Sequence, residues 1–319
     1  MIKVEYLMNL SSLELCKYHS KYFKTWWNPN TFDWKNCSSS LAKYCSKYFT
    51  TWWDPKRFYW SKGSKDLAEY CSEYFTTWWD PKRFYWSKGS GNLAAHCNKY
   101  FTTWWDPKKF DWKWYSGELA EHCTKYFNIW WDPKSFVWEV YSGDLAKYCS
   151  KYFTIWWDPK AYNWEECSEE LAHYCSKYFT TWWDPKLIDM SSAEVSLVTY
   201  CSEYFTEWWD SKKFDWKWYS GELAEHCTKY FNIWWDAEKF IWVVSEDFNQ
   251  YGPLALVKYC QSYFDKWWDD DKWDWEKHSQ ELIDYCADKF STLHLKKLLF
   301  YKDPYARAFA KGELDRRSK

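Results

Sequence analysis

The sequence has little glycine, proline or methionine: 8 Gly, 9 Pro and 3 Met among 319 residues. It contains no glycine-rich phosphate loop, no G-x-S-x-G motif and no unique set of serine, histidine and aspartate of the kind that nucleophilic hydrolases use. No stretch approaches the roughly 18 consecutive apolar residues that a membrane-spanning helix needs. The 43 Lys and Arg nearly cancel the 45 Asp and Glu, so net charge does not indicate nucleic acid or an acidic membrane as the partner.

The N-terminal residues MIKVEYLMNLSS lack the basic and then apolar order of a secretory signal peptide. Thirteen Cys is an odd number, and without an export signal it favours reduced thiols over a disulfide framework. We therefore expect an intracellular protein, cytoplasmic or nuclear, with no membrane partner.

Aromatic residues are abundant: 32 Trp, 28 Tyr and 21 Phe make up a quarter of the chain. Trp pairs recur every 26 residues from Trp26-Trp27 to Trp234-Trp235, and a tenth pair, Trp267-Trp268, follows 33 residues later. Each unit reads L-A-x-[YH]-C-x-x-Y-F-x-x-W-W-D-P-K-x-F-x-W. An eleventh, degenerate unit has Leu293 and His294 in place of the Trp pair, as a capping repeat would.

The periodicity within a unit predicts helices. From Leu93 to Trp105 the apolar residues cover about half of a helical wheel, which indicates a long inner helix over positions such as 91 to 105. Asp106 and Pro107 suit the N-cap and first position of a short second helix, with serines such as Ser64 and Ser90 capping the next long helix. The period-two alternation after Pro107 fits a short strand instead, as in a helix-plus-strand horseshoe solenoid.

We therefore predict an all-α, elongated α-solenoid of ten 26-residue helix-turn-helix repeats plus a degenerate C-terminal cap, with the horseshoe as the alternative. A single array is expected over residues 1–294, with an insertion near 245–253, followed by a C-terminal cap and basic tail over 295–319. Repeat seven departs from the pattern, with Ile188 and Met190 where Phe and Trp are expected.

The recurring Trp and Cys are interpreted as core residues. Both Trp of a pair lie on or beside the apolar stripe, which leaves Trp112 and its equivalents, with Trp114 and Trp218, as candidates for an exposed aromatic edge. Adjacent pairs such as His96-Cys97 point about 100° apart on a helix, so they do not converge on one metal ion. We expect no metal and no cofactor.

The candidate partner-binding residues lie outside the predicted core. One Lys follows the proline position in successive units and forms a row that we name the Lys ridge: Lys56, Lys82, Lys108, Lys134, Lys160, Lys186 and Lys212. Lys99, Thr102 and Thr103 occupy the polar back of the predicted long helix.

Ten near-identical units favour a non-catalytic scaffold for protein–protein binding or structural assembly. The alternative is a modular nucleic-acid-binding protein that uses the Lys ridge and aromatic edges. An enzyme is not expected; a catalytic site would have to lie where the repeat breaks, near Asp189, Glu194, Asp247 or His278.

The Trp pair followed by N-P or D-P and F-x-W, as in Trp26 to Trp34 and again in Trp52 to Trp60, resembles Trp-rich tandem repeats in uncharacterised proteins of large DNA viruses of amoebae. The resemblance covers most of the chain. It implies an intracellular viral protein, a virion or assembly component, and supplies no catalytic residues.

Overall fold

The computed structural model describes residues 6–7, 9–242, 252–269, 272–273, 275–301 and 303–318. Every regular element in these ranges is a helix, so the all-α class is confirmed and the helix-plus-strand horseshoe is wrong for the described part of the chain. Two compact units, Met1–Tyr162 and Asn163–Lys319, are described separately below. Most of the expected insertion, including Asp247, lies outside the described residues, and the single array over 1–294 stays a prediction.

In the first unit each repeat consists of a long helix, a 3-10 turn and a one-turn helix. The long helices are α2 (Ser12–His19), α4 (Trp34–Cys45), α6 (Trp60–Tyr70), α8 (Trp86–His96), α10 (Trp112–His122) and α12 (Trp138–Cys149). The short helices are α3 (Phe23–Trp26), α5 (Phe49–Trp52), α7 (Phe75–Trp78), α9 (Phe101–Trp104), α11 (Phe127–Trp130) and α13 (Phe153–Trp156).

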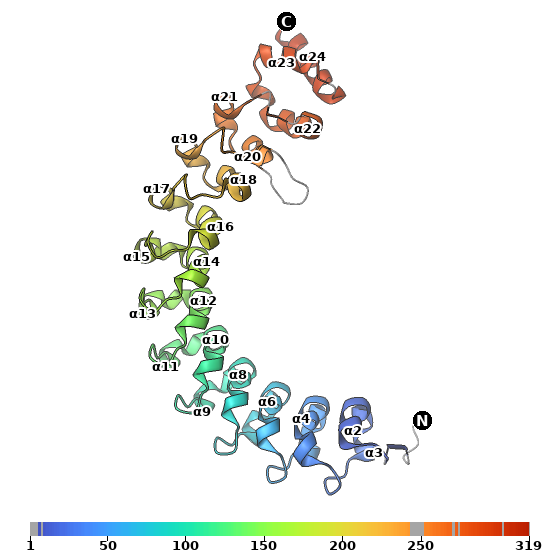
Figure 1. Ribbon diagram of the computed structural model, residues 1–319. Helices are drawn as coiled ribbons and strands as arrows, with labels where there is room; N and C mark the ends of the chain where they lie inside the picture. The colour runs from blue at the N-terminus through green and yellow to red at the C-terminus, as the bar shows by residue number, and fades with distance from the viewer. Residues whose placement is uncertain are drawn as a thin grey trace. The chain divides into compact units, whose positions relative to one another are not determined.

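The second unit continues the same pattern. Its long helices are α14 (Trp164–Tyr174), α16 (Met190–Tyr200), α18 (Trp216–His226), α20 (Gly252–Tyr259) and α22 (Trp275–Cys286). Its short helices are α15 (Phe179–Trp182), α17 (Phe205–Trp208), α19 (Phe231–Trp234) and α21 (Phe264–Trp267). Within each unit, consecutive long helices pack on one another, as α4 on α6 and α14 on α16 do, and the short helices lie in a second row (Figure 1). This neighbour-to-neighbour packing is that of an α-solenoid.

The expected long helix over 91 to 105 is wrong in its bounds, because the chain leaves the helix at Cys97, where φ is −112° and ψ is 19°. The break frees the Cys97 carbonyl from the helical ladder. That oxygen instead accepts hydrogen bonds from the Tyr100 amide at 2.9 Å and from the Trp104 indole Nε1 at 2.9 Å. A buried indole N–H needs an acceptor, and the break supplies one.

The helix expected after Asp106-Pro107 is also wrong. Asp106 starts a tight turn in which its Oδ1 accepts from the Lys108 amide at 3.1 Å and its carbonyl accepts from the Phe110 amide at 3.0 Å. The next helix begins only at Trp112. Aspartate therefore caps a turn here, which is the other structure its short side chain favours.

Aromatic side chains fill much of the interior of the repeats. In the fourth repeat Phe101 and Trp104 are fully buried, whereas Trp105 is half-buried and stacks on Phe101 with ring centroids 5.0 Å apart. Trp105 also contacts Phe110 at 5.3 Å, the contact expected of a hydrophobic staple. The first Trp of the pair is thus core as predicted, and the second lines the edge of the core.

The serines expected as N-caps lie inside the long helices and are buried, so that assignment is wrong. Ser64 donates its hydroxyl to the Trp60 carbonyl at 2.7 Å and accepts the amide of Tyr85, in the next repeat, at 3.0 Å. One hydroxyl thereby satisfies a carbonyl of its own helix and an amide of the neighbouring turn. The same inter-repeat bond joins Asp33 to Ser12, Tyr59 to Ser38, Asp111 to Ser90 and, in the second unit, Asp189 to Ser168.

The C-terminal segment packs on the last repeat through α23 (Thr292–Leu298) and α24 (Pro304–Arg317). Asp303 caps α24, accepting the amides of Tyr305 and Ala306, and its other contact is the hydroxyl of Ser279 on α22. Arg317 donates to the Phe290 carbonyl at 2.8 Å. Part of the basic tail therefore forms a helix that contacts the degenerate repeat.

Candidate functional site

The cysteines lie in the core. All thirteen Cys are free thiols and are buried. Cys97 directs its thiol at the Ala68 carbonyl of the preceding repeat, with Sγ and O 3.6 Å apart, and burial raises the pKa of this thiol to about 12. The same contact recurs from Cys71 to Ala42 and from Cys227 to Val198. These thiols hold successive repeats together and are not poised as nucleophiles at neutral pH.

Metal ligation finds no support in the described residues, where no three His, Cys, Asp or Glu side chains come together to hold an ion. His122 illustrates why: its Nε2 lies 3.3 Å from Glu118 on its own helix, while its neighbour Cys123 faces the core.

The short-helix side of the array carries the predicted candidates Lys99, Thr102 and Thr103, and all three are exposed. Lys99 lies over the Tyr100 ring, with its Nζ 4.8 Å from the ring centroid. The two threonines recur unchanged on the two preceding repeats, and all are exposed: Thr50, Thr51, Thr76 and Thr77. We name these six threonines the Thr face.

Beside the short-helix row, every residue of the Lys ridge is exposed, and each backbone amide in the ridge is bonded to the aspartate that begins its turn. The residue after the ridge lysine contacts the preceding turn where it is arginine, at Arg57 and Arg83. Arg83 pairs with Asp80 and donates to the Pro55 carbonyl of the preceding turn at 2.7 Å. The ridge side chains themselves have no ion pair within the described residues.

The long-helix side presents a second recurring surface, at a position that was not among the predicted binding residues. Tyr or His stands just before the Cys position in each repeat, which His19 occupies in the first, and we name this row the Tyr/His column: Tyr18, Tyr44, Tyr70, His96, His122, Tyr148, Tyr174, Tyr200, His226, Tyr259 and Tyr285.

In two places, neighbouring members of this column are linked by the residue that precedes one of them. In the first unit Lys43 lies between Tyr44 and Tyr70, its Nζ 5.5 and 5.7 Å from the two ring centroids. In the second unit His173 stacks between Tyr174 and Tyr200, with both centroid distances 4.0 Å. The 26-residue recurrence of this aromatic position was the signal that could have identified the column.

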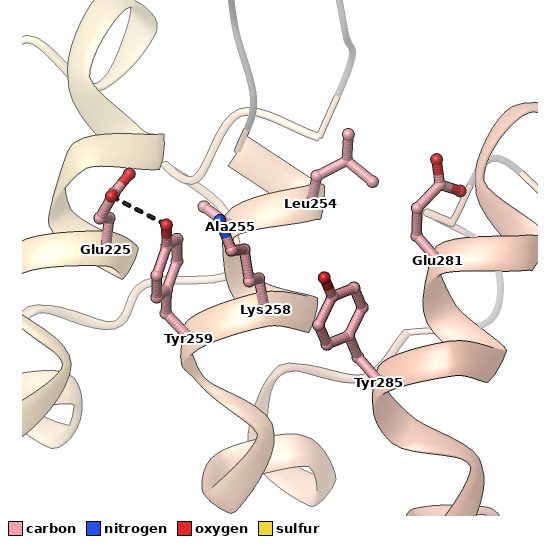
Figure 2. Close-up of a pocket in the computed structure, with 7 residues that line it drawn as sticks. All are labelled: Glu225, Leu254, Ala255, Lys258, Tyr259, Glu281 and Tyr285. Carbon is pink, nitrogen blue, oxygen red and sulfur yellow. Dashed lines mark hydrogen bonds between the residues drawn. The ribbon is translucent and has the colours of Figure 1, made fainter.

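A shallow hollow of about 290 Å³ lies on this side of the second unit (Figure 2). It is bounded by Lys258 and Tyr259 of α20 and by Glu281 and Tyr285 of α22. The Tyr259 hydroxyl donates to Glu225 at 2.8 Å, and Lys258 lies over the Tyr259 ring at 4.8 Å. The hollow is thus a gap between successive members of the Tyr/His column.

Of the predicted exposed aromatic edge, Trp114 is 62% exposed and Trp218 41% exposed. Trp112 is only half-buried, because it packs against Trp105 and Phe110 and donates its indole N–H to the Pro107 carbonyl at 2.9 Å. The exposed aromatic edge is therefore not continuous from repeat to repeat, since exposed Val140 stands at the position equivalent to Trp114 in the next repeat.

Helix α16, which follows repeat seven, differs from the other long helices at the positions noted in the sequence. Glu194 occupies the place of the buried serine, and both of its carboxylate oxygens accept the Asp215 amide, at 3.1 and 3.2 Å. Burial, with Asp215 and Asp189 nearby, raises the pKa of Glu194 to about 7. His278 lies far along the chain from this group, in the last repeat, so the structure does not join the two breaks into one site.

Comparisons with protein families, with curated proteins and with solved structures give no match to this chain. No described helix is long and apolar enough to cross a membrane.

Proposed function

We propose that the protein is a non-catalytic scaffold that binds a protein partner, or further copies of itself, along the repeated surface of its short-helix side. The observation that carries this proposal is that different recurring residues of each repeat serve internal packing and the exposed surface. The recurring Cys thiols and Ser hydroxyls bridge adjacent repeats, and the Trp indole joins the short helix to the long helix of its own repeat, whereas the Thr face and the Lys ridge recur at the surface.

A row of equivalent exposed positions suits a partner that makes many weak contacts, since linked sites raise the overall affinity without any single strong contact. Threonine offers a hydroxyl and a methyl group to such a partner, and in the later repeats of the first unit Ile129 and Ile155, each 55% exposed, take one threonine position. The resemblance to viral Trp-rich repeat proteins fits this assembly role.

A matched pair of surface variants tests the proposal. Thr51→Glu/Thr77→Glu/Thr103→Glu changes the short-helix side, and Lys65→Glu/Lys88→Glu changes exposed positions on the long helices α6 and α8. After chemical crosslinking and nuclease treatment, a stoichiometric protein partner captured by the wild type should be lost with the first variant and kept with the second. The reverse pattern would move the binding face to the long helices.

Nucleic-acid binding is the second candidate, and the unpaired ammonium groups of the Lys ridge favour it. Counterion release then requires affinity for single-stranded nucleic acid to fall steeply with the logarithm of salt concentration. Replacing Lys56, Lys82, Lys108, Lys134 and Lys160 with Gln should reduce that slope by about 0.7 for each phosphate contact that is lost.

A further inference from the structure

The clearest break in the array forms a pocket within the second unit. Helix α16 has Met190 where the flanking helices α14 and α18 have Trp164 and Trp216, and Glu194 where they have Ser168 and Ser220. A hollow of about 540 Å³ opens at this place. Its lining consists of Asp189, Met190, Ser191, Glu194, Lys213, Asp215, Trp218 and Tyr219.

Glu194 is the buried group of this pocket, with 2% of its surface exposed. Serine in the same place donates to a helix carbonyl and accepts an amide, as Ser168 does, but an ionised carboxylate can only accept. Glu194 receives one backbone N–H, from Asp215. A carboxylate buried with a single neutral donor and two further carboxylates nearby is costly unless a cation neutralises it.

No side chain of the described residues forms an ion pair with Glu194. Lys213 lines the pocket, yet it forms no ion pair with any acid of the described residues. Its equivalents are engaged: Lys109 pairs with Asp106 and lies 5.9 Å from the Trp86 ring centroid, and Lys239 pairs with Asp236 and lies 5.9 Å from Trp216. At the position where these two lysines have a Trp partner, Lys213 has Met190. The change from Trp to Met thus accounts for both the open space and the unengaged lysine.

The charges and surfaces of the pocket define what fits. Asp189, Glu194 and Asp215 set three carboxyl groups against the one ammonium of Lys213, and Trp218 and Tyr219 add aromatic surface of the kind that attracts cations. We propose that this pocket binds an organic cation, an alkylammonium or guanidinium group, whose charge pairs with Glu194. The group belongs either to a small free amine or to a Lys or Arg side chain of another protein; the site does not depend on the scaffold function.

Binding of this kind competes with a proton, because burial holds the pKa of Glu194 near 7 and the cation requires the ionised form. The other titratable groups that face Glu194 across the pocket are Asp189, Lys213, Asp215 and Tyr219. Affinity should therefore rise at least tenfold between pH 5.5 and pH 8.5.

Calorimetric titration of the full chain tests the proposal, with agmatine as the free cation and a blocked Gly-Arg-Gly peptide as the side-chain form. Glu194→Ser and Met190→Trp each restore the residue of the flanking repeats, so both variants should fold, as a cooperative melt will verify. The first removes the charge and the second fills the space; each should weaken binding at least tenfold at pH 8.5. Lys213→Ala should strengthen it.

Binding of agmatine would identify a small-molecule site, and binding of the peptide alone would identify a side-chain site; either outcome supports the pocket. The proposal is overturned if neither probe binds, if Glu194→Ser binds as tightly as the wild type, or if affinity does not change with pH.

Discussion

The indole Nε1 of Trp130 donates a 3.0 Å hydrogen bond to the backbone carbonyl of Cys123, seven residues earlier. The same bond recurs in the other repeats, from Trp52 to Cys45, Trp78 to Cys71, Trp156 to Cys149, Trp182 to Cys175 and Trp234 to Cys227. It connects the short helix to the end of the long helix, at the point where the helical ladder breaks. The first Trp of each pair therefore fixes the short helix against the end of the long helix.

Replacing Trp130 with Ala should lower the free energy of unfolding by about 3–5 kcal/mol, because it removes a fully buried side chain and leaves a cavity. Trp114→Ala is the matched control; this side chain is 62% exposed, and its loss should change stability by less than about 0.5 kcal/mol. Urea unfolding measures both. Equal stability of the two variants would show that Trp130 is not a core residue.

Replacing a buried serine should lower the free energy of unfolding by more than the small size of its side chain suggests. Ser64→Ala leaves the Tyr85 amide without its acceptor, and a buried unsatisfied donor costs about 1–3 kcal/mol. Ser61→Ala, on the exposed face of the same helix, should have almost no effect. A thermal melt in which the two variants are indistinguishable would count against the inter-repeat role of the serine.

The thiols should be unreactive until the protein unfolds. Burial raises the pKa of Cys97 from an ordinary 9.0 to about 12, so the folded thiol stays protonated where the unfolded one ionises, and its stabilising effect is lost as pH rises above about 9. All thirteen Cys should be alkylated after unfolding without reductant and none in the native state at pH 7.5. Rapid native alkylation would contradict their burial.

The effect of Glu194 on stability should change with pH in the direction opposite to that of an acid whose pKa is lowered by folding. Its pKa is raised from 4.5 to about 7, so the folded state holds the proton more tightly, and the stability this provides is complete below pH 4.5 and lost as pH rises through 7. Relative to Glu194→Ser, the wild type should lose about 1–3 kcal/mol over that interval. Denaturant titrations at several pH values measure the difference; parallel curves for the two proteins would refute it.

The sequence predicted the repeat, its helical class and its core because these follow from a 26-residue period and a 3.6-residue stripe. It did not predict the break at Cys97, because an amphipathic stripe remains continuous through a short 3-10 turn. The roles of Asp106 and Ser64 were assigned wrongly, since both residue types serve equally as helix caps and as bridges within turns or helices. That choice depends on which amide of the neighbouring repeat comes within reach.

The candidate surfaces were predicted unevenly for the same reason. Lys99, Thr102 and Thr103 are exposed as expected, because polar residues on the back of a helix have nothing to pack against. The Tyr/His column was missed as a surface: its stacked arrangement, such as His173 between Tyr174 and Tyr200, arises from contacts between repeats. The 26-residue period shows that such contacts recur, but their geometry can be known only from the three-dimensional structure.

The most direct test of the scaffold account is a quantitative pull-down with the full chain at near-physiological salt, after nuclease treatment, alongside the threonine variant Thr51→Glu/Thr77→Glu/Thr103→Glu. The account predicts one stoichiometric protein partner, or the chain itself, captured by the wild type and lost with the variant. Recovery of no protein partner, together with tight binding of single-stranded nucleic acid that weakens steeply with salt, would contradict it.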